Sequence, residues 1–463
     1  MDKDLQARQE ARDLAKQAGL AQKELFTFPQ EKLNAITRAI ARAISAAAPE
    51  LAHMAVEETG FGNVSDKITK NQFASRTVLE AIEPMKCVGI LKEEPGLWEV
   101  GVPVGVIAAI VPSTNPTSTV CYKAMIALKA GNAIVFSPHP KALACTLRAT
   151  QIVAKAAEDA GAPKGSVSCL RVPSLDGCRE LMSAADVRLI LATGGPAMVK
   201  AAYSSGKPAI GVGAGNGPAY LHPSCNLRDA LEKILKSKTF DNGTVCASEQ
   251  SIIVEKTMAK EAEETAKTMG YYFMDENEAK ALAAILFRPN GALNPDIVGK
   301  TAQVLAEKAG FCVPQSVKVL VARQQDVGPD RPYSHEKLCP VLAWFEAESE
   351  EAAKTLAIKV LSHEGVGHTF AIHANNTDAV RKLCRDIPVS RFLVNTPAAL
   401  GGIGAQTKLF PALTLGCGAV GGSSSSNNIS PMDLVNIRKV AWGESKEDTL
   451  VEILTAKILE RLK

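Results

Sequence analysis

The sequence lacks the paired cysteines that mark a disulfide framework or a structural zinc site. Its 11 cysteines are odd in number, and no two of them form a C-x-x-C pair. This pattern excludes the disulfide-rich secreted domains and the zinc-finger classes, and it fits reduced thiols. We therefore expect a cytoplasmic protein.

Long hydrophobic runs are also missing. The longest apolar stretch, Val100 to Val111, is interrupted by Pro103 and is too short to span a bilayer. The first residues, Met1 to Leu5, are charged and lack the apolar core of a secretion signal. We expect neither a membrane anchor nor a secreted protein.

A strong charge of one sign is the third missing feature. The formal net charge is +3, and no block is rich in lysine or arginine, so nucleic acid and anionic membranes are not expected as partners. We find no internal repeats. What remains is an ordinary globular composition, 46% hydrophobic and 22% charged, in a chain long enough for two or three domains.

Helices are expected first. Over residues 4–59 apolar side chains recur at helical spacing, as Leu33, Ile36 and Ile40 illustrate. Two strands then follow, 88–91 and 97–102, joined through a turn that contains Pro95-Gly96. Such a hairpin either projects as an oligomer contact or packs against its own domain.

From residue 104 to 225 the pattern alternates between strand and helix. The expected strands are 104–111, 131–136, 167–172 and 187–192. This predicts a doubly wound parallel α/β domain, in which ligands bind beyond the carboxyl ends of the strands. Asn115, His139 and Gly194 fall at such ends. A second α/β unit is expected over 226–410.

Glycines gather in two places within this region. Gly194 and Gly195 precede Pro196 at the start of an expected helix, where free N–H groups can bind a pyrophosphate; an ordinary strand-to-helix turn is the alternative. The segment 210–218 predicts a flat, flexible backbone that a large planar ligand can approach.

Cys246 is the candidate nucleophile. It lies between Gly243 and Ala247 among small and polar residues, which leaves room for a reactant at the sulfur. If the cysteine opens a turn or helix, its own N–H can stabilise an oxyanion, and the local dipole favours the thiolate. The alternative is a small core residue. His139, His335, His363 and His368 stand too far apart to suggest a metal site.

Together these motifs resemble the aldehyde dehydrogenase superfamily, and within it the CoA-acylating branch, over roughly residues 10–443. The resemblance rests on these stretches: Glu57-Glu58-Thr59-Gly60, Pro112-Ser113-Thr114-Asn115-Pro116, Ser137-Pro138-His139-Pro140, Thr193-Gly194-Gly195, Gly211-Val212-Gly213-Ala214-Gly215-Asn216, Cys246, His335-Glu336-Lys337-Leu338-Cys339-Pro340, Gly367-His368-Thr369 and Thr414-Leu415-Gly416-Cys417-Gly418.

The resemblance implies a division of the chain. The expected parts are an NAD/CoA-binding domain of Rossmann type over 1–225 with an oligomerisation hairpin at about 86–104, an α/β catalytic domain over 226–410, a return to the cofactor domain and an interface strand over 411–443, and an amphipathic tail over 444–463.

The resemblance also implies roles for the site residues. Cys246 would attack the aldehyde carbonyl, and the Asn115 side-chain N–H and the Cys246 backbone N–H would form the oxyanion hole, each donor contributing roughly 3–4 kcal/mol. Glu336 would hold the nicotinamide ribose of NAD. The expected cofactor-binding residues are Pro112, Ser113, Thr114, Ser137, Pro138, His139, Thr193, Gly194, Gly195, Gly211, Val212, Gly213, Glu336 and Leu338.

The second half of the reaction separates the branches. Hydrolytic relatives place a water-activating glutamate at about the position of Val212, and valine cannot act as a base. Coenzyme A is therefore the expected acceptor, in much of the site that NAD leaves. The Ser137–Pro140 segment lacks the lysine that holds the adenosine ribose in relatives; we expect NAD, with NADP as the alternative.

We therefore expect a dehydrogenase that converts a short-chain aldehyde, propanal or acetaldehyde, to its acyl-CoA. We expect it to act as a homodimer or homotetramer. The alternatives are a hydrolytic dehydrogenase that releases the free acid and a catalytically silent assembly protein that keeps the fold. The sequence assigns no role to His368.

The tail carries an apolar stripe at helical spacing, with Ile453, Leu454 and Ile458 among its members. Three interpretations stay open: packing on its own subunit, docking into a bacterial microcompartment shell, or binding another partner. Related encapsulation helices are usually N-terminal, so a C-terminal one would depart from the pattern. A microcompartment lumen is accordingly the alternative location.

Overall fold

Helices fill the first part of the chain. The computed structural model describes residues 2–443 and 446–462. Helices α1 (Lys3–Leu25) and α2 (Gln30–Thr59) each bury one face, and Leu33, Ile36 and Ile40 of α2 are fully buried, which confirms the predicted helical region. Three shorter helical segments follow: α3 (Val64–Gln72), a π-helical turn (Phe73–Thr77) and α4 (Val78–Ile82).

The first sheet has five parallel strands in the order β5-β4-β3-β6-β7. Its strands are β3 (Val106–Ile110), β4 (Ile134–Ser137), β5 (Val167–Cys169), β6 (Val187–Thr193) and β7 (Ala209–Val212). The intervening helices are α5 (Pro116–Lys129), α6 (Leu143–Asp159), α7 (Leu175–Ser183) and α8 (Pro196–Tyr203). From β3 the chain passes to β4 and β5 on one side, and it then returns to β6 and β7 on the other side of β3. Right-handed crossovers therefore place helices on both faces of the sheet. The predicted doubly wound α/β fold is confirmed.

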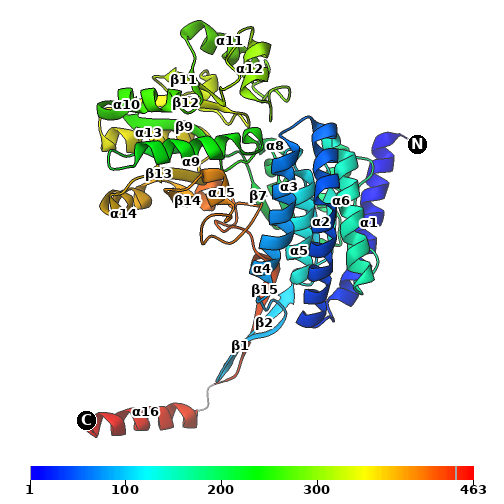
Figure 1. The fold of residues 1–463 in the computed structure, drawn as a ribbon. Helices are drawn as coiled ribbons and strands as arrows, with labels where there is room; N and C mark the ends of the chain where they lie inside the picture. The colour runs from blue at the N-terminus through cyan, green and yellow to red at the C-terminus, as the bar shows by residue number, and fades with distance from the viewer. Residues whose placement is uncertain (1, 444–445, 463) are drawn as a thin grey trace.

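The second sheet has seven parallel strands in the order β10-β11-β12-β9-β8-β13-β14. They are β8 (Gly217–Leu221), β9 (Glu249–Glu255), β10 (Tyr271–Phe273), β11 (Val319–Gln324), β12 (Val341–Ala347), β13 (Gly367–His373) and β14 (Val389–Val394). The accompanying helices are α9 (Leu227–Thr239), α10 (Lys256–Lys267), α11 (Glu276–Leu286), α12 (Ala302–Ala309), α13 (Glu350–His363), α14 (Thr377–Asp386) and α15 (Ala398–Gly402). Figure 1 shows this unit beside the helical part of the first one.

Two predictions about this region need correction. The boundary expected at residue 225 is too late, because β8 already belongs to the second sheet and the change of sheet occurs between residues 212 and 217. The glycine-rich segment 210–218 is not one flexible stretch: its ends form β7 and β8, and the loop 213–216 joins them. Sheet hydrogen bonds from neighbouring strands fix both ends.

A three-stranded arm leaves the body. The predicted hairpin forms as β1 (Gly89–Glu94) and β2 (Leu97–Pro103), and β15 (Val435–Ala441) pairs antiparallel with the free edge of β2. Figure 1 shows this arm projecting, with helix α16 (Lys446–Arg461) beyond its tip. Residues 444, 445 and 463 of the predicted tail lie outside the described residues. None of the helices in the described part of the chain is long and apolar enough to cross a membrane.

Candidate active site

Cys246 lies in a tight turn over residues 244–248, the nucleophile turn, which leads into β9. The turn is closed by the Ser248 N–H, which donates to the Val245 carbonyl at 2.9 Å, and both neighbours of the cysteine, Val245 and Ala247, are buried. The thiol itself is half-buried. The predicted turn is therefore present, and within the described residues the Cys246 N–H donates to no other residue.

Burial is the main influence on the pKa of the Cys246 thiol. Burial and then the Glu336 carboxyl raise the thiol pKa to about 12, whereas the Arg391 guanidinium acts in the opposite direction. Arg391 is itself buried, and among the residues that the structure describes it bonds to hydroxyl and carbonyl oxygens and to no carboxylate. Its guanidinium is held by carbonyl oxygens, the shortest bond being 2.7 Å from Nη2 to Gly416 O. An unpaired buried cation beside the thiol favours the thiolate whenever the sulfur ionises.

Asn115 reaches the nucleophile turn from the first sheet. It follows β3 and stands at the N-terminus of α5. Its Nδ2 donates weakly to the carbonyl of Thr244, at 3.4 Å, and to Thr114 Oγ1, at 3.2 Å. Because Thr244 is two residues before Cys246, the structure brings the two predicted catalytic residues together from different sheets.

A buried charge cluster that the sequence did not predict supports Asn115. Lys70 of α3 donates its Nζ protons to Asn115 Oδ1 and to Asp241 Oδ2, both at 2.5 Å, and Lys67 donates to the same Asp241 oxygen at 2.9 Å. Neither amine is more than 3% exposed. The sequence feature that could have pointed to this cluster is the acidic Asp241, five residues before Cys246. A buried carboxylate needs counter-charges, and Lys67 and Lys70 supply them.

Most of the predicted cofactor residues meet at one edge of the first sheet. Residues 112–114, 137–139, 193–195 and 211–213 all lie at or beyond the carboxyl ends of β3, β4, β6 and β7. Ile110 of β3 lies beside Ser137 of β4 on one side and beside Ala192 of β6 on the other, and this is the point where the strand order reverses. This is where open α/β sheets bind nucleotides.

The helix start in this edge can accept a diphosphate. Gly195 precedes α8 with no side-chain cap, so the first N–H groups of the helix are unoccupied by a neighbouring side chain. Cβ atoms added at Gly195 and at Gly213 would meet nothing within 4 Å, which leaves space beside the backbone. Gly211 differs: an added Cβ would lie 2.7 Å from Val199, so this glycine makes room for α8. The edge therefore fits the phosphates of NAD.

Glu336 and Leu338 come from the second unit, in the segment before β12. Glu336 Oε1 accepts the Gly215 N–H at 2.9 Å, which brings the carboxyl to the loop between β7 and β8. Burial raises the pKa of Glu336 to about 8. Leu338 has a left-handed backbone, with φ of 46°. Val212 is 2% exposed and ends β7, so no carboxylate stands at its position.

The histidines form no metal cluster. Over residues 2–443 and 446–462 no group of three or more histidine, cysteine, aspartate or glutamate side chains could hold a metal ion. His139 caps a short turn by accepting the Lys141 N–H at 3.1 Å. His335 and His363 lie 3.3 Å apart through their Nε2 atoms. His368 is fully buried, and its pKa is well below the usual range because of burial and the nearby Arg391.

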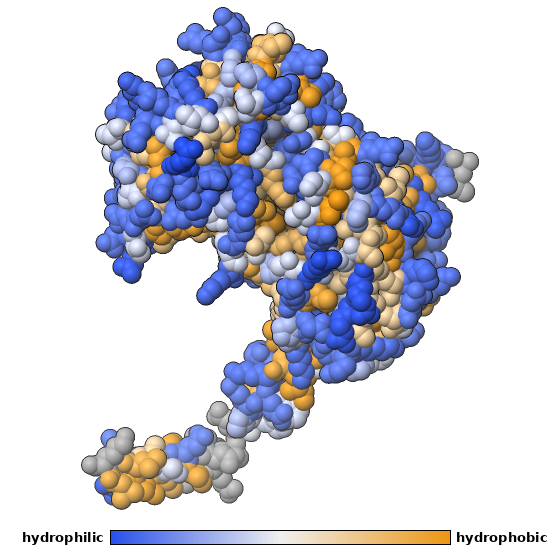
Figure 2. Space-filling view, viewed as in Figure 1, coloured by the Kyte–Doolittle hydropathy of each residue, from blue (hydrophilic) through white to orange (hydrophobic). Residues whose placement is uncertain are grey.

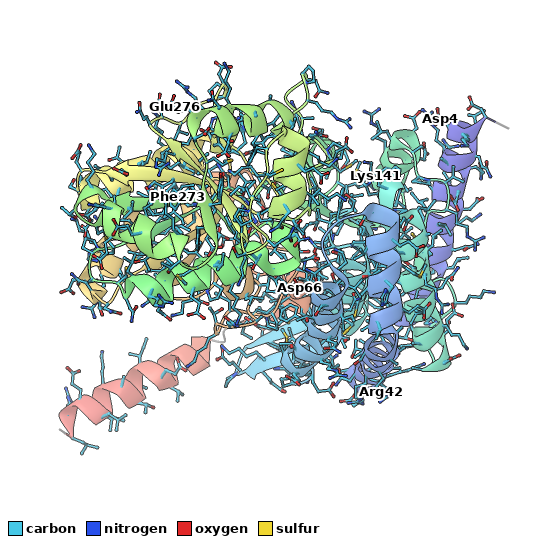
Figure 3. The ribbon with its side chains drawn as sticks, turned by 45° about the horizontal axis from the view of Figure 1, so that its top comes forward. Asp4, Arg42, Asp66, Lys141, Phe273 and Glu276 are labelled. Carbon is cyan, nitrogen blue, oxygen red and sulfur yellow. The ribbon has the colours of Figure 1, made fainter. Side chains whose placement is uncertain are left out.

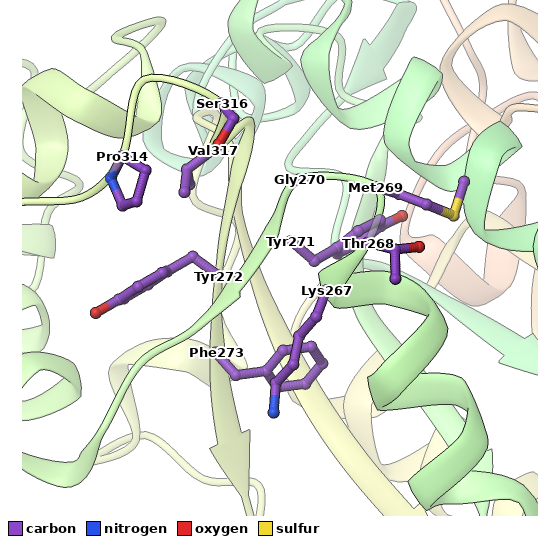
Figure 4. Close-up of a pocket in the computed structure, with 10 residues that line it drawn as sticks. All are labelled: Lys267, Thr268, Met269, Gly270, Tyr271, Tyr272, Phe273, Pro314, Ser316 and Val317. Carbon is purple, nitrogen blue, oxygen red and sulfur yellow. The ribbon is translucent and has the colours of Figure 1, made fainter.

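The hollow shown in Figure 4 is unrelated to this site. It has a volume of 480 Å³ and lies at the edge of the second sheet, where Lys267, Tyr272, Phe273 and Ser316 contribute to its lining. No predicted site residue borders it. The Lys267 ammonium lies over the Phe273 ring there, with Nζ 5.5 Å from the ring centroid.

Comparisons with known proteins identify the family of the chain. The model of the "Aldehyde dehydrogenase family" matches residues 4–271. The chain is 45% identical over 428 residues to the bifunctional aldehyde-alcohol dehydrogenase of Escherichia coli K12, covering 91% of this chain but only 48% of that relative, so it spans about half the relative's length. It is 36% identical to succinate-semialdehyde dehydrogenase (acetylating) of Clostridium kluyveri, covering 93% of this chain and 95% of that one.

Solved structures give the same result. An acetylating aldehyde dehydrogenase from Geobacillus thermoglucosidasius matches with a TM-score of 0.94 and 48% identity, over 96% of this chain and 99% of that one. A propionaldehyde dehydrogenase from a Clostridium phytofermentans fucose utilisation bacterial microcompartment matches at 0.85 and 30%, over 93% and 97%. A Rhodopseudomonas palustris propionaldehyde dehydrogenase with bound propionyl-CoA matches at 0.85 and 29%, over 93% and 94%. The resemblance found in the sequence is confirmed, and the chain belongs to the aldehyde dehydrogenase family.

Proposed function

We propose that the chain is an NAD-dependent, CoA-acylating aldehyde dehydrogenase: an oxidoreductase that converts propanal or acetaldehyde, with NAD and coenzyme A, to acyl-CoA and NADH. The proposal rests on one observation: the Asn115 amide lies against the turn that holds Cys246, and the nearby strand β7 ends in a valine, Val212. Relatives named as acetylating, and one structure with bound propionyl-CoA, support it.

The first step is attack of the Cys246 thiolate on the aldehyde carbon. The C–S bond forms as the carbonyl π electrons move to oxygen, which becomes an oxyanion. The Cys246 N–H and the Asn115 Nδ2–H, whose present acceptors are weak or absent, are the donors proposed for that oxygen. Arg391 would favour the ionised sulfur.

The cofactor would lie along the edge of the first sheet. Gly194 and Gly195 would bind its phosphates through backbone N–H groups, and Glu336 would hold the nicotinamide ribose. Bound NAD supplies a hydride acceptor for the carbon attached to Cys246, and a thioester on Cys246 is what remains. NADP is the alternative cofactor, since His139 stands in the segment where relatives carry a ribose-binding lysine.

The second step is attack on this thioester by the thiolate of coenzyme A, whose proton has been released to solvent. The new tetrahedral oxyanion would occupy the same two donors, and its collapse would break the bond to Cys246 and return the sulfur to the enzyme. Water would need a general base, and a buried valine at position 212 provides none. A thiol is already a few per cent ionised near neutral pH, so it needs less assistance.

The test is NADH formation from propanal with and without coenzyme A, with the product identified by mass. Strict dependence on coenzyme A with propanoyl-CoA as product supports the proposal. Turnover to propanoate without coenzyme A would favour the hydrolytic reading, and no turnover of either aldehyde would favour a silent assembly protein.

We also propose a homodimer or homotetramer that uses the arm. Ile90 of β1, Leu97 of β2 and Ile437 of β15 are exposed there, and Trp98 and Trp442 pack edge to face, with ring centroids 4.8 Å apart. These apolar groups need cover of the kind that a second copy provides. Light scattering of the intact protein and of an Ile437→Lys variant tests this, with dissociation of the variant as the expected result.

The proposed partner of the tail is a microcompartment shell protein, which would place the enzyme in that lumen rather than free in the cytoplasm. In the described part of α16, Val451, Ile453, Leu454, Ile458 and Leu459 are each at least half exposed, and Figure 2 shows an apolar face there. Such a helix is marginal alone and gains stability by docking. The hypothesis fails if removal of residues 444–463 leaves co-assembly with shell proteins unchanged; packing on its own subunit, or another partner, would then be favoured.

A further inference from the structure

A buried carboxylate joins the helical part of the molecule to the nucleophile turn. Asp241 is fully buried and has a left-handed backbone, with φ of 47°. Its Oδ1 accepts the Asn63 N–H at 2.9 Å, and its Oδ2 accepts the Thr244 hydroxyl at 2.7 Å. Its own N–H donates to Asp66 Oδ2 at 2.7 Å. Figure 3 shows Asp66 on α3 where this helix meets the second unit.

Two lysines of α3 complete the cluster, but they do different things. Both donate to Asp241 Oδ2, Lys67 at 2.9 Å and Lys70 at 2.5 Å. Lys67 sends its remaining contact to a main-chain oxygen, Thr114 O, at 3.0 Å. Lys70 instead contacts the predicted oxyanion-hole residue itself, at Asn115 Oδ1. The two amines are thus matched in burial and in carboxylate partner. They differ in their other acceptors, because Lys70 also donates to Thr244 Oγ1 at 3.1 Å.

The contact with Lys70 decides which end of the Asn115 amide faces the reactants. An ammonium group has only donors, so the amide atom 2.5 Å from it is the oxygen, and the NH₂ end must point the other way. That end makes only the two long bonds to Thr114 and Thr244. A cation on the carbonyl oxygen also polarises the amide and strengthens its N–H as a donor.

We propose that Lys70 is a positioning residue for the oxyanion hole, which orients and polarises the Asn115 amide while Asp241 holds the ammonium in place. The inference rests on the proposed function, because it assumes that an oxyanion forms beside Cys246. Lys70 itself touches neither substrate nor sulfur; it acts through Asn115. The amine is retained in a buried site because Asp241 supplies the compensating charge.

The test compares Lys70→Met with Lys67→Met. Both variants lose a bond to Asp241, but only Lys70→Met loses the contacts with Asn115 and Thr244. Removal of one oxyanion donor costs about 10²–10³-fold in kcat, so we expect K70M to lose about 10- to 100-fold in kcat with little change in KM. K67M should retain a kcat at least about tenfold above that of K70M. Equal losses in the two variants would overturn the inference.

Two further readouts separate positioning from damage to the fold. Methyl methanethiosulfonate reacts with a thiol without forming an oxyanion, so K70M should label Cys246 at the wild-type rate. In a double-mutant cycle, K70M should add little to the loss caused by Asn115→Ala, because both act through one amide. Slowed labelling, or a full additional loss in the N115A background, would overturn the inference.

If K70M does not fold, Lys70→Gln provides the second variant. Its side-chain NH₂ can still donate to Asn115 Oδ1 without the charge, so we expect it to retain more kcat than K70M in every preparation that melts cooperatively. A kcat of K70Q no higher than that of K70M would contradict the inference. Where K70M cannot be prepared, N115A provides the value for this comparison. Wild-type protein is assayed first. Absence of CoA-dependent NADH formation there would count against the proposed function, whereas normal wild-type activity with an unaffected K70M would count against Lys70 alone.

Discussion

Glu336 and Gly215 lie in direct contact, with the carboxyl Oε1 accepting the glycine N–H at 2.9 Å. The same glycine touches the nucleophile turn: a Cβ at Gly215 would lie 1.8 Å from the Cys246 carbonyl oxygen. One small residue therefore fixes the distances among the candidate ribose ligand, the loop between the two sheets and the sulfur.

Gly215→Ala is expected to displace that turn. A backbone oxygen cannot move aside as a flexible side chain can, so the shift would reach Cys246, and a misplacement of about 1 Å costs on the order of 10²-fold in rate. The measurement is kcat together with the rate of Cys246 labelling by methyl methanethiosulfonate. Gly328→Ala is the control, because its added Cβ meets only Arg331 at 4.0 Å; equal behaviour of the two variants would contradict the prediction.

Val212→Glu is expected to introduce hydrolysis. A carboxylate at the end of β7 would supply the missing base for water, so propanoate should appear without coenzyme A. The variant should also melt at a lower temperature, because a charge enters a side-chain position that is 2% exposed. Val212→Gln has a similar shape and no base. Propanoate from the glutamine variant at the same rate would show that basicity is not the cause.

Glu336→Gln is expected to make Cys246 more acidic. Burial is the main reason for the raised thiol pKa and the Glu336 carboxyl is the next, so replacing that carboxyl by a neutral amide should lower the pKa from about 12. The pH profile of thiol labelling should move to lower pH, while the KM for NAD rises because the proposed ribose ligand is weakened.

Glu364→Gln is the control for this shift. Glu364 Oε2 accepts the Glu336 N–H at 2.7 Å, so the variant perturbs the same segment, yet Glu364 is not among the groups that act on the thiol pKa. An identical shift in both variants would mean that the segment, and not the Glu336 charge, controls the cysteine.

Lys70 is expected to set an alkaline limit on kcat. Burial lowers its pKa to about 8, against the opposing influence of Asp241; the other charged groups around it are Lys67 and Asp66, on its own helix. The ammonium is therefore present below this pH and is lost above it, so kcat should decline as pH rises through about 8. The decline should be absent in K70Q, whose amide does not titrate; its persistence there would assign the limit to another group.

The small and polar neighbours of Cys246 made it the candidate nucleophile, and the family resemblance added Asn115, whose amide the structure places at the Thr244 carbonyl. The sequence was not sufficient for the cluster behind them. Lys67 and Lys70 lie on α3, a short polar helix that reads as a solvated surface, and only the fold shows that Asp241 lies against it.

The fold shows the same division. Repeating strands and helices were predicted because their apolar periods are strong, whereas α11 and α12 were missed because they are short and only Leu282, Leu286 and a few similar residues are buried. Gly211 was expected to approach the cofactor, but contacts with Val199 and Tyr203 explain the glycine by helix packing. Sequence spacing does not distinguish these two uses of glycine.

The arm described above also dictates an order of events during synthesis. Its first two strands leave the ribosome early, but the third, β15, follows only after the whole second sheet has been made. Until then one edge of β2 is unpaired, and the nascent hairpin can offer only part of its surface to another copy. If copies associate through the arm as proposed, the complete contact surface forms only after both sheets have been made, and the unpaired edge of β2 stays open to strand pairing until then.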